Sequence, residues 1–490
     1  MPRAGSHALM KAILAAVLLT AALAGCLDGD PDGDDGSSGT GGEPTGPQRP
    51  TMPEDPMPEG AGHDHTDPET HKFLWNYAFS ARDPLLQNQA SIAGVHALDL
   101  QDGYLFGAVY GSHSASVDGG LVIWDLTDPA RPVETGRWTV PGAVGGDRSL
   151  EATQDADFAV LATESVDCLG HINPTAVSVY LIDTSDKSLP VVADVISTAG
   201  PSAGSPDRIA PSLGEHSVAV HRIAGQDYAF IFGKIFEIAR GEGAGAALVD
   251  TGARINTGHD IYVRDTPWGD VWALSANGGG GLQVYDVTDP TAPREITAWD
   301  LPERQALASE GIRYYFHTAD VAFFDDEILI VVSSEDWEDH TSPMWILDAT
   351  SLDGSAEGDL TWIGTWENPG GHTALGTSFS LHNPRFSHDG VLSISSYHGG
   401  LWQMDFRDPS FRADPAEVAY AVYAEGEQTA VQDPVHQTVE SRLCGLGLTL
   451  DAPTYMDVEV GEDGTLYLAD VYMGLYTFTP TAEHPVFGEA

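Results

Sequence analysis

Histidine is the residue type whose placement in this chain best suits chemistry. His96, His216, His259 and His382 stand at comparable places, each at the entrance of a short apolar segment, and His317 lies two residues earlier than the equivalent place in a fifth segment. Neutral imidazoles beside carboxylates bind zinc, copper or iron, so these five residues form a candidate transition-metal site. The chain has no tight spacing such as His-Glu-x-x-His, so tertiary structure must bring the five side chains together.

Three interpretations of these histidines stay open. Each histidine could hydrogen-bond to a neighbouring structural unit, the set could hold a metal ion, or the set could line a polar pocket for a small ligand or a partner's loop. Longer segments expected on the same face carry further polar residues, namely His113, His171, Asp336, Glu338, His340 and His398. Catalytic residues stay unassigned, and we lean toward a protein that is not an enzyme.

A repeated phrase identifies the elements that must position the histidines. Residues 120–132 read Gly-Leu-Val-Ile-Trp-Asp-Leu-Thr-Asp-Pro-Ala-Arg-Pro, residues 281–293 restate the pattern, and residues 400–409 keep its glycine, apolar run and Asp-Pro pair. A β-branched and aromatic run between glycine and Asp-Pro predicts a strand that ends in a turn. Two strand patterns precede each copy and one follows it. Each repeat therefore predicts a four-stranded antiparallel unit, the size of a propeller blade.

Seven such units, some of them degenerate, are expected between about residues 91 and 480. The last unit lacks an outer strand, and a spare strand pattern stands ahead of the first unit at residues 73–79. We therefore predict an all-β fold, a closed seven-bladed β-propeller over residues 72–482 in which an N-terminal strand completes the C-terminal blade. Residues 483–490 are expected to form a tail. Because innermost strands line the central channel, the five histidines should converge at its mouth.

The phrase Gly-Leu-x-x-x-Asp-x-Thr-Asp-Pro-x-x-Pro resembles the LVIVD repeat of propeller-forming surface proteins of archaea and bacteria. Three copies carry the resemblance clearly. It implies the fold well and the function poorly, because propellers host many unrelated activities. Selenium-binding proteins, some of which oxidise methanethiol, are also propellers with histidines thought to hold copper. This chain is similar to them only in fold class and in its histidine-rich channel mouth, so no residue role is transferred from them.

The N-terminal 25 residues have the pattern of an export signal. Arg3 and Lys11 flank an apolar core at residues 12–22, which is too short to remain as a membrane span. The sequence Leu-Ala-Gly-Cys that ends at Cys26 resembles a lipobox, in which the cysteine is lipid-modified and becomes the mature N-terminus. Residues 26–71 are rich in Asp, Gly, Ser, Thr, Glu and Pro, which predicts a disordered acidic spacer. We therefore expect an extracytoplasmic lipoprotein anchored to the cell membrane.

The charge of the chain is strongly acidic. It has 73 Asp and Glu against 22 Lys and Arg, a formal net charge of −51. Such a surface repels phosphates, so nucleic acid is excluded as a partner. Acidic residues spread along the whole chain suit solvation in high salt, which favours a halophilic archaeal source.

Two cysteines remain after Cys26, and their state stays open. Cys168 and Cys444 form an even pair in an oxidising compartment. Both are expected in long loops on the same face of the propeller, where they either form a disulfide or remain two thiols.

Taken together, these patterns predict a lipid-anchored cell-surface binding or interaction module. Its partner would be a protein or small-molecule ligand at the channel-mouth face. If the metal interpretation of the histidines holds, they would bind copper, zinc or iron there. The alternative is a metal-dependent oxidoreductase that uses the same histidines. The ligand, the metal and the oligomeric state are not readable from the sequence.

Overall fold

The structure, a computed structural model, describes residues between 73 and 488 with gaps, and all of them belong to one compact unit. The described ranges are 73–83, 85–88, 91–92, 94–110, 119–140, 144–164, 178–197, 217–241, 245–256, 258–302, 304, 307, 314–335, 342–354, 358–368, 380–387, 390–397, 399–410, 412–422, 455–471 and 474–488. Among these residues, none forms a helix of the length and apolar character needed to cross a bilayer.

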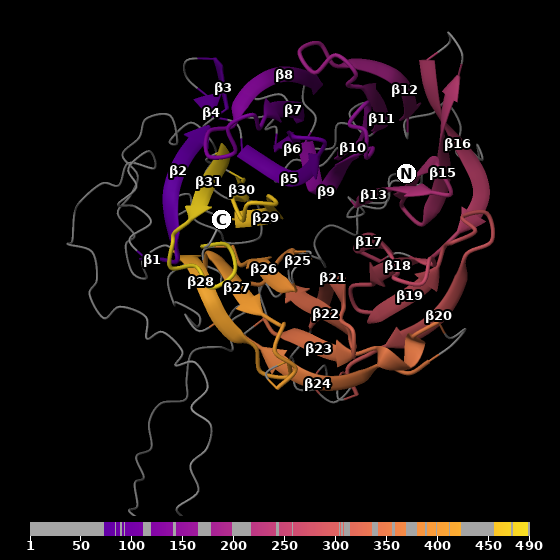
Figure 1. Ribbon diagram of the computed structural model, residues 1–490. Coiled ribbons are helices and arrows are strands. Elements are labelled where there is room, and N and C mark those ends of the chain that lie inside the picture. Colours follow the sequence, from indigo (N-terminus) through magenta and orange to yellow (C-terminus); the bar gives the residue numbers. More distant parts are fainter. Residues whose placement is uncertain are drawn as a thin grey trace, which may run out of the picture. The chain divides into compact units, whose positions relative to one another are not determined.

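The described strands confirm a seven-bladed β-propeller of four-stranded antiparallel blades (Figure 1). The innermost strand of each blade comes first in the chain, except that the N-terminal strands join the last two blades. Blade 1 contains β5 (Gly94–Gln101), β6 (Tyr104–Tyr110), β7 (Gly119–Asp125) and β8 (Val133–Val140), and blade 2 contains β9 (Val144–Ala152), β10 (Phe158–Glu164), β11 (Ser178–Asp183) and β12 (Val191–Ser197). Blade 3 contains β13 (Val218–Ile223), β14 (Gln226–Ile231), β15 (Lys234–Gly241) and β16 (Gly245–Arg254). Blade 4 contains β17 (Asp260–Asp265), β18 (Val271–Ala276), β19 (Leu282–Asp286) and β20 (Arg294–Trp299).

The remaining blades close the ring. Blade 5 contains β21 (Tyr315–Phe323), β22 (Ile328–Glu335), β23 (Met344–Asp348) and β24 (Thr361–Trp366). Blade 6 contains β25 (Pro384–Phe386), β26 (Val391–Ser395), β27 (Leu401–Asp405) and β28 (Ala416–Val422). Blade 7 contains β29 (Tyr455–Val460), β30 (Leu466–Asp470) and β31 (Gly474–Pro480). A 3₁₀ turn, η2 (Thr350–Leu352), follows β23, and the short strands β3 (Leu86–Asn88) and β4 (Ser91–Ile92) pair with each other.

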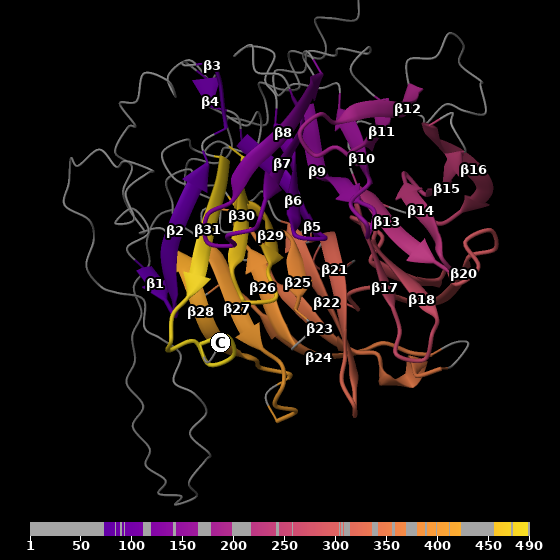
Figure 2. The ribbon, with the colours of Figure 1, turned by 45° about the horizontal axis from the view of Figure 1, so that its top comes forward.

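The N-terminal strand closes the C-terminal blade, as the sequence predicts, but it is divided in two. β1 (Phe73–Trp75) pairs with β28 as a fifth strand of blade 6, and β2 (Tyr77–Asp83) pairs with β31 as the outer strand of blade 7. Asn76 between them has a φ of 61°, a left-handed conformation that Asn tolerates better than most residues. Figure 2 shows β1 beside β28 and β2 beside β31.

Blade 3 shows where the repeat signal is weakest. Its third and fourth strands, β15 and β16, could not be placed well from the sequence, because this blade lacks the Gly-Leu and Asp-Pro phrase. In the structure they form a long hairpin whose register runs from Gly241↔Gly245 to Lys234↔Arg254. Tertiary pairing therefore completes a blade that the local pattern leaves undefined.

The glycine and the aspartate of the repeated phrase are each required for a different structural reason. Gly281 has a φ of +83°, and a Cβ there would lie 2.3 Å from the carbonyl oxygen of Trp299; at Gly120 the corresponding distance to the oxygen of Trp138 is 2.1 Å. Any side chain would clash with the neighbouring fourth strand at these points. In the following turn, Asp125 Oδ1 accepts from the backbone N–H and the hydroxyl of Thr127, at 2.7 and 2.6 Å. The repeat thus records a close strand approach followed by a side-chain-capped turn.

Adjacent inner strands are joined by carboxylate side chains that accept hydrogen bonds from backbone N–H groups. A carboxylate on one blade accepts from the first strand of the next blade, which satisfies buried donors at the channel wall. These pairs are Asp457 Oδ2 with Leu98 N (2.9 Å), Asp99 Oδ2 with Ala152 N (2.7 Å), Glu151 Oε2 with Val220 N (2.6 Å) and Asp320 Oδ2 with Phe386 N (2.8 Å).

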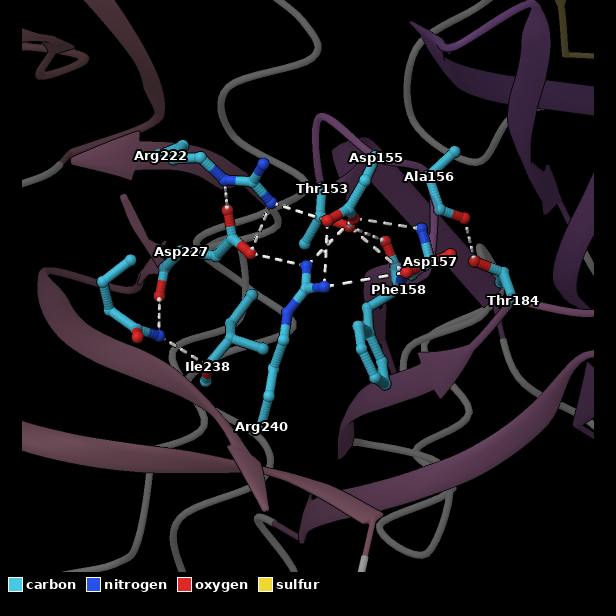
Figure 3. Close-up of polar contacts among 11 residues, drawn as sticks. Thr153, Asp155, Ala156, Asp157, Phe158, Thr184, Arg222, Asp227, Ile238 and Arg240 are labelled. Atoms are coloured by element: carbon cyan, nitrogen blue, oxygen red, sulfur yellow. Dashed lines mark hydrogen bonds and ion pairs between the residues drawn. The ribbon is translucent and has the colours of Figure 1, made fainter. Parts of the chain in front are cut away.

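An ion-pair cluster joins blades 2 and 3 away from the histidines (Figure 3). Arg222 contacts Asp155 at 2.8 Å and Asp227 at 2.7 Å, and Arg240 contacts Asp227 at 2.6 Å. Burial raises the pKa of Asp155, but the hydrogen bonds from Arg240 and Arg222 outweigh it and hold this pKa well below its ordinary value. The cluster therefore links the two blades by charge as well as by packing.

Candidate metal centre

Three of the five candidate histidines lie together. His259 directly precedes β17, His317 is in β21 and His382 stands two residues before β25, so they come from the neighbouring blades 4, 5 and 6. The ring centroids of His259 and His317 are 4.2 Å apart, and those of His317 and His382 are 4.1 Å apart. Successive inner strands thus bring into contact side chains that are far apart in the chain.

The other two predicted ligands are not placed in this cluster. His96 is buried on β5 of blade 1. Among the described residues, it belongs to neither group of side chains whose potential ligand atoms converge. His216 lies outside the described residues. The same holds for His113, His171, Asp336, Glu338, His340 and His398, for the predicted lipidation site Cys26, and for the cysteines Cys168 and Cys444.

Two groups of possible ligands converge, and they share His317. One group is His259, Asp260 and His317, and the other is His317, Glu335 and His382; within each, the ligand atoms lie within 4.8 Å of one another. All five residues are buried. Low dielectric and several adjacent donors strengthen the binding of a cation, provided that the histidines are neutral.

The surroundings of His382 determine which of its nitrogens carries the proton. Its Nδ1 lies within hydrogen-bond distance of the backbone carbonyl oxygen of Met456, on blade 7. A carbonyl oxygen can only accept, so Nδ1 carries the proton and the lone pair lies on Nε2. A metal-binding histidine normally donates its other ring N–H to an acceptor in this way, which fixes the orientation of the ring and its tautomer.

His317 has a comparable second partner. Its Nδ1 lies 2.6 Å from the hydroxyl oxygen of Thr318, and that hydroxyl donates to Asp260 Oδ2 at 2.6 Å. The hydroxyl oxygen also lies 3.0 Å from Asn383 Oδ1, and its single proton goes to the nearer and charged carboxylate. The hydroxyl oxygen therefore accepts from Nδ1–H, and Nε2 again carries the lone pair. The Asp260–Thr318–His317 series therefore orients this imidazole as a carboxylate orients a metal-binding histidine.

Glu335, at the end of β22, faces the lone pair of His317. Glu335 Oε2 lies 3.7 Å from His317 Nε2, while the hydroxyl of Tyr397 donates to Glu335 Oε1. Two ligands of a tetrahedral zinc ion lie roughly 3.3–3.4 Å apart, so the pair needs to close by a few tenths of an ångström. Two imidazoles and one carboxylate are a donor set suited to zinc, iron(II) or copper(II).

Sequence reasoning missed the residues that complete this centre. Asp260 was overlooked although it directly follows His259. Glu335, Thr318 and Tyr397 belong to no motif. Thr318 follows His317 on β21, and the pairing of β22 with β21 brings Glu335 beside His317. The packing of blade 6 against blade 5 brings Tyr397 to Glu335. A polar residue at the buried end of an apolar strand, as Glu335 is in β22, was the one signal that could have found the carboxylate.

The channel wall also carries a second, structural group of charges. Arg385 Nη2 lies 2.5 Å from Glu459 Oε1, and the guanidinium of Arg385 lies 5.3 Å from the centre of the Tyr262 ring. Burial lowers the pKa of Arg385, but Glu459 and other nearby anions outweigh it, and the net direction is upward. Burial and the neighbouring Glu151 raise the pKa of Asp99 above its ordinary value.

Comparisons with known proteins add similarity of shape only. No family model and no curated protein matches the chain. Among solved structures, a periplasmic gluconolactonase of Pseudomonas aeruginosa is 14% identical with a TM-score of 0.47, the match covering 71% of this chain and 92% of that one. A hypothetical selenium-binding protein of Sulfolobus tokodaii is 12% identical with a TM-score of 0.46, covering 79% and 91%. At these scores neither neighbour brings an activity to this chain.

Proposed function

We propose that this propeller binds a transition-metal ion through His317 Nε2, His382 Nε2 and one oxygen of Glu335. The observation that supports the proposal is that both imidazoles have their Nδ1–H groups engaged elsewhere, on Thr318 and on Met456. Both lone pairs therefore lie on Nε2, and for His317 this nitrogen faces the carboxylate. His259 and Asp260 stand beside His317 as an alternative ligand group.

The setting of this function is proposed from the sequence. The repeated phrase supports membership of the LVIVD-repeat propellers. Residues 1–25, Cys26 and the spacer to residue 71 support export, lipid anchoring and display outside the cell membrane, and the acidic composition supports a halophilic archaeal source. In this setting the channel-mouth face recognises a protein or small-molecule ligand, and the metal centre either stabilises that face or takes part in recognition.

Metal titration of the purified full chain tests the proposal. Zn²⁺, Cu²⁺ and Fe²⁺ are added to chelator-treated protein, and bound metal is measured by elemental analysis and calorimetry. We expect one ion per chain, and His317→Ala and His382→Ala should each weaken binding by at least about 100-fold, more than loss of an orienting residue does. His96→Ala is the matched control, because it removes a buried inner-strand histidine outside both groups. Wild type without stoichiometric metal, or equal loss in all three variants, contradicts the proposal.

A second candidate is a metal-dependent oxidoreductase. It is favoured by the donor set itself, since two histidines and one carboxylate are also the ligands of non-haem iron(II) oxygenases. Oxygen uptake by the iron-loaded protein with small thiols, compared with the zinc-loaded protein, separates this candidate from a binding module. Metal-independent or absent oxygen uptake rejects it.

A further inference from the structure

Tyr397 contacts two of the three proposed ligands. It is fully buried in the turn between β26 and β27 of blade 6. Its hydroxyl donates to Glu335 Oε1, and its ring centroid lies 5.1 Å from that of His382. One tyrosine therefore reaches from blade 6 to the carboxylate on blade 5 while packing beside the imidazole of its own blade.

The backbone at Tyr397 is held in an unfavourable conformation. Its φ is 32°, in the positive region that bulky residues rarely occupy. Blade 7 helps to maintain it, because the carbonyl oxygen of Tyr397 accepts from Tyr455 N at 3.2 Å in an isolated β-bridge. The turn is closed by Ser396 N, which donates to the oxygen of Gly400 at 2.8 Å. The surrounding contacts thus outweigh the strain of a backbone that directs the phenol toward Glu335.

We infer that Tyr397 is a positioning residue that makes Glu335 a monodentate metal ligand, an inference that rests on the proposed metal site. The hydroxyl occupies Oε1, while Oε2 is the oxygen that faces His317 Nε2. A carboxylate held in this way offers one oxygen to the ion. Two imidazoles and one oxygen then fill three positions of a tetrahedral site and leave a fourth position for water or a ligand.

A role limited to packing would give a different result. A buried phenol and a buried carboxylate stabilise each other by hydrogen bonding whether or not a metal binds. A purely structural Tyr397 would therefore influence folding but leave the coordination of the ion unchanged. The distinguishing measurement is the geometry of the metal site itself.

The experiment compares wild type, Tyr397→Phe and the control Tyr420→Phe, all as full chains. Tyr420 is a mostly buried tyrosine on β28 of the same blade, with its ring 5.1 Å from Trp402. Each protein is titrated with Co²⁺, and the visible absorption and the dissociation constant are recorded. Circular dichroism confirms that the fold of each variant is retained.

We expect Tyr397→Phe to weaken Co²⁺ binding about 10–100-fold, as loss of an orienting residue does. The visible bands of Co²⁺ should also weaken, because the released Oε1 can bind the ion and raise its coordination number. Tyr420→Phe should match wild type in both measurements. If wild type binds Co²⁺ and Tyr397→Phe has the same affinity and spectrum, the role of Tyr397 is refuted and the metal site stands. If wild type does not bind, both are refuted.

Discussion

His484 should make the stability of the propeller fall in mild acid. Although the sequence predicts a tail at residues 483–490, His484 is only 2% exposed and packs edge-on against Tyr77. Its Nδ1 accepts from the backbone N–H groups of Val486 and Phe487, at 3.2 and 3.1 Å. An N–H group can only donate, so Nδ1 is unprotonated and the proton lies on Nε2, which donates to Gln403 Oε1 at 3.0 Å. If Nδ1 were protonated, its N–H would point at the N–H groups of Val486 and Phe487, and both hydrogen bonds would be lost.

The direction of the pH effect follows from the pKa of His484. Burial first, and then Arg407, lower this pKa from 6.5 to about 4, with Asp405 acting in the opposite direction. Between these two values the unfolded chain binds a proton that the folded chain does not. The free energy of unfolding therefore includes a contribution from His484 that is present above pH 6.5 and is lost as the pH falls.

The size of the contribution follows from the same shift. A gap of about 2.5 units between the folded and unfolded pKa values, at about 1.36 kcal/mol per unit, bounds it at roughly 3 kcal/mol. Between pH 7 and pH 5 the unfolding free energy should fall by about 2 kcal/mol because of this residue. Asp99 acts in the opposite sense, since its raised pKa favours the folded state at low pH. A difference between two proteins is therefore needed to isolate His484.

Urea unfolding followed by tryptophan fluorescence, at several pH values and constant salt, measures that difference. The comparison protein is His484→Asn, because an asparagine oxygen can accept the same N–H groups but does not titrate. The advantage of wild type over this variant should shrink by about 2 kcal/mol from pH 7 to pH 5. A difference that stays constant across this range would refute the assignment of a neutral, acceptor Nδ1.

Two further predictions concern the charge clusters. Arg385→Met should cost about 3–5 kcal/mol of unfolding free energy, because it leaves Glu459 and the carboxylates near it without their buried cation; unchanged urea unfolding would contradict this. Asp227→Asn should cost about 1–2 kcal/mol, since Asp227 is buried and receives hydrogen bonds from the partly exposed Arg222 and Arg240. For that variant, thermal unfolding is the measurement, and a melting temperature equal to that of wild type would show that the pairs contribute nothing net.

The sequence by itself determined the fold. The glycine of the repeat marks a place where a neighbouring strand leaves no room for a Cβ, as at Gly281, and the aspartate caps the following turn, as at Asp125. Both requirements act over a few residues, so they remain visible in a linear pattern. The same locality explains why blade 3, which lacks the phrase, was placed poorly. It also explains why the N-terminal strand was expected as one piece and not as two.

Only the tertiary structure decided which polar residues meet. His96 and His382 occupy comparable places in their segments, yet His382 lies beside His317 because their blades are neighbours, whereas His96 belongs to blade 1. Glu335 and Tyr397 have no pattern of their own. Glu335 reaches His317 through the pairing of β22 with β21. Tyr397 reaches Glu335 because blades 5, 6 and 7 pack side by side and hold its strained turn. Such convergence depends on contacts between residues far apart in the chain, and local sequence periodicity carries no record of it.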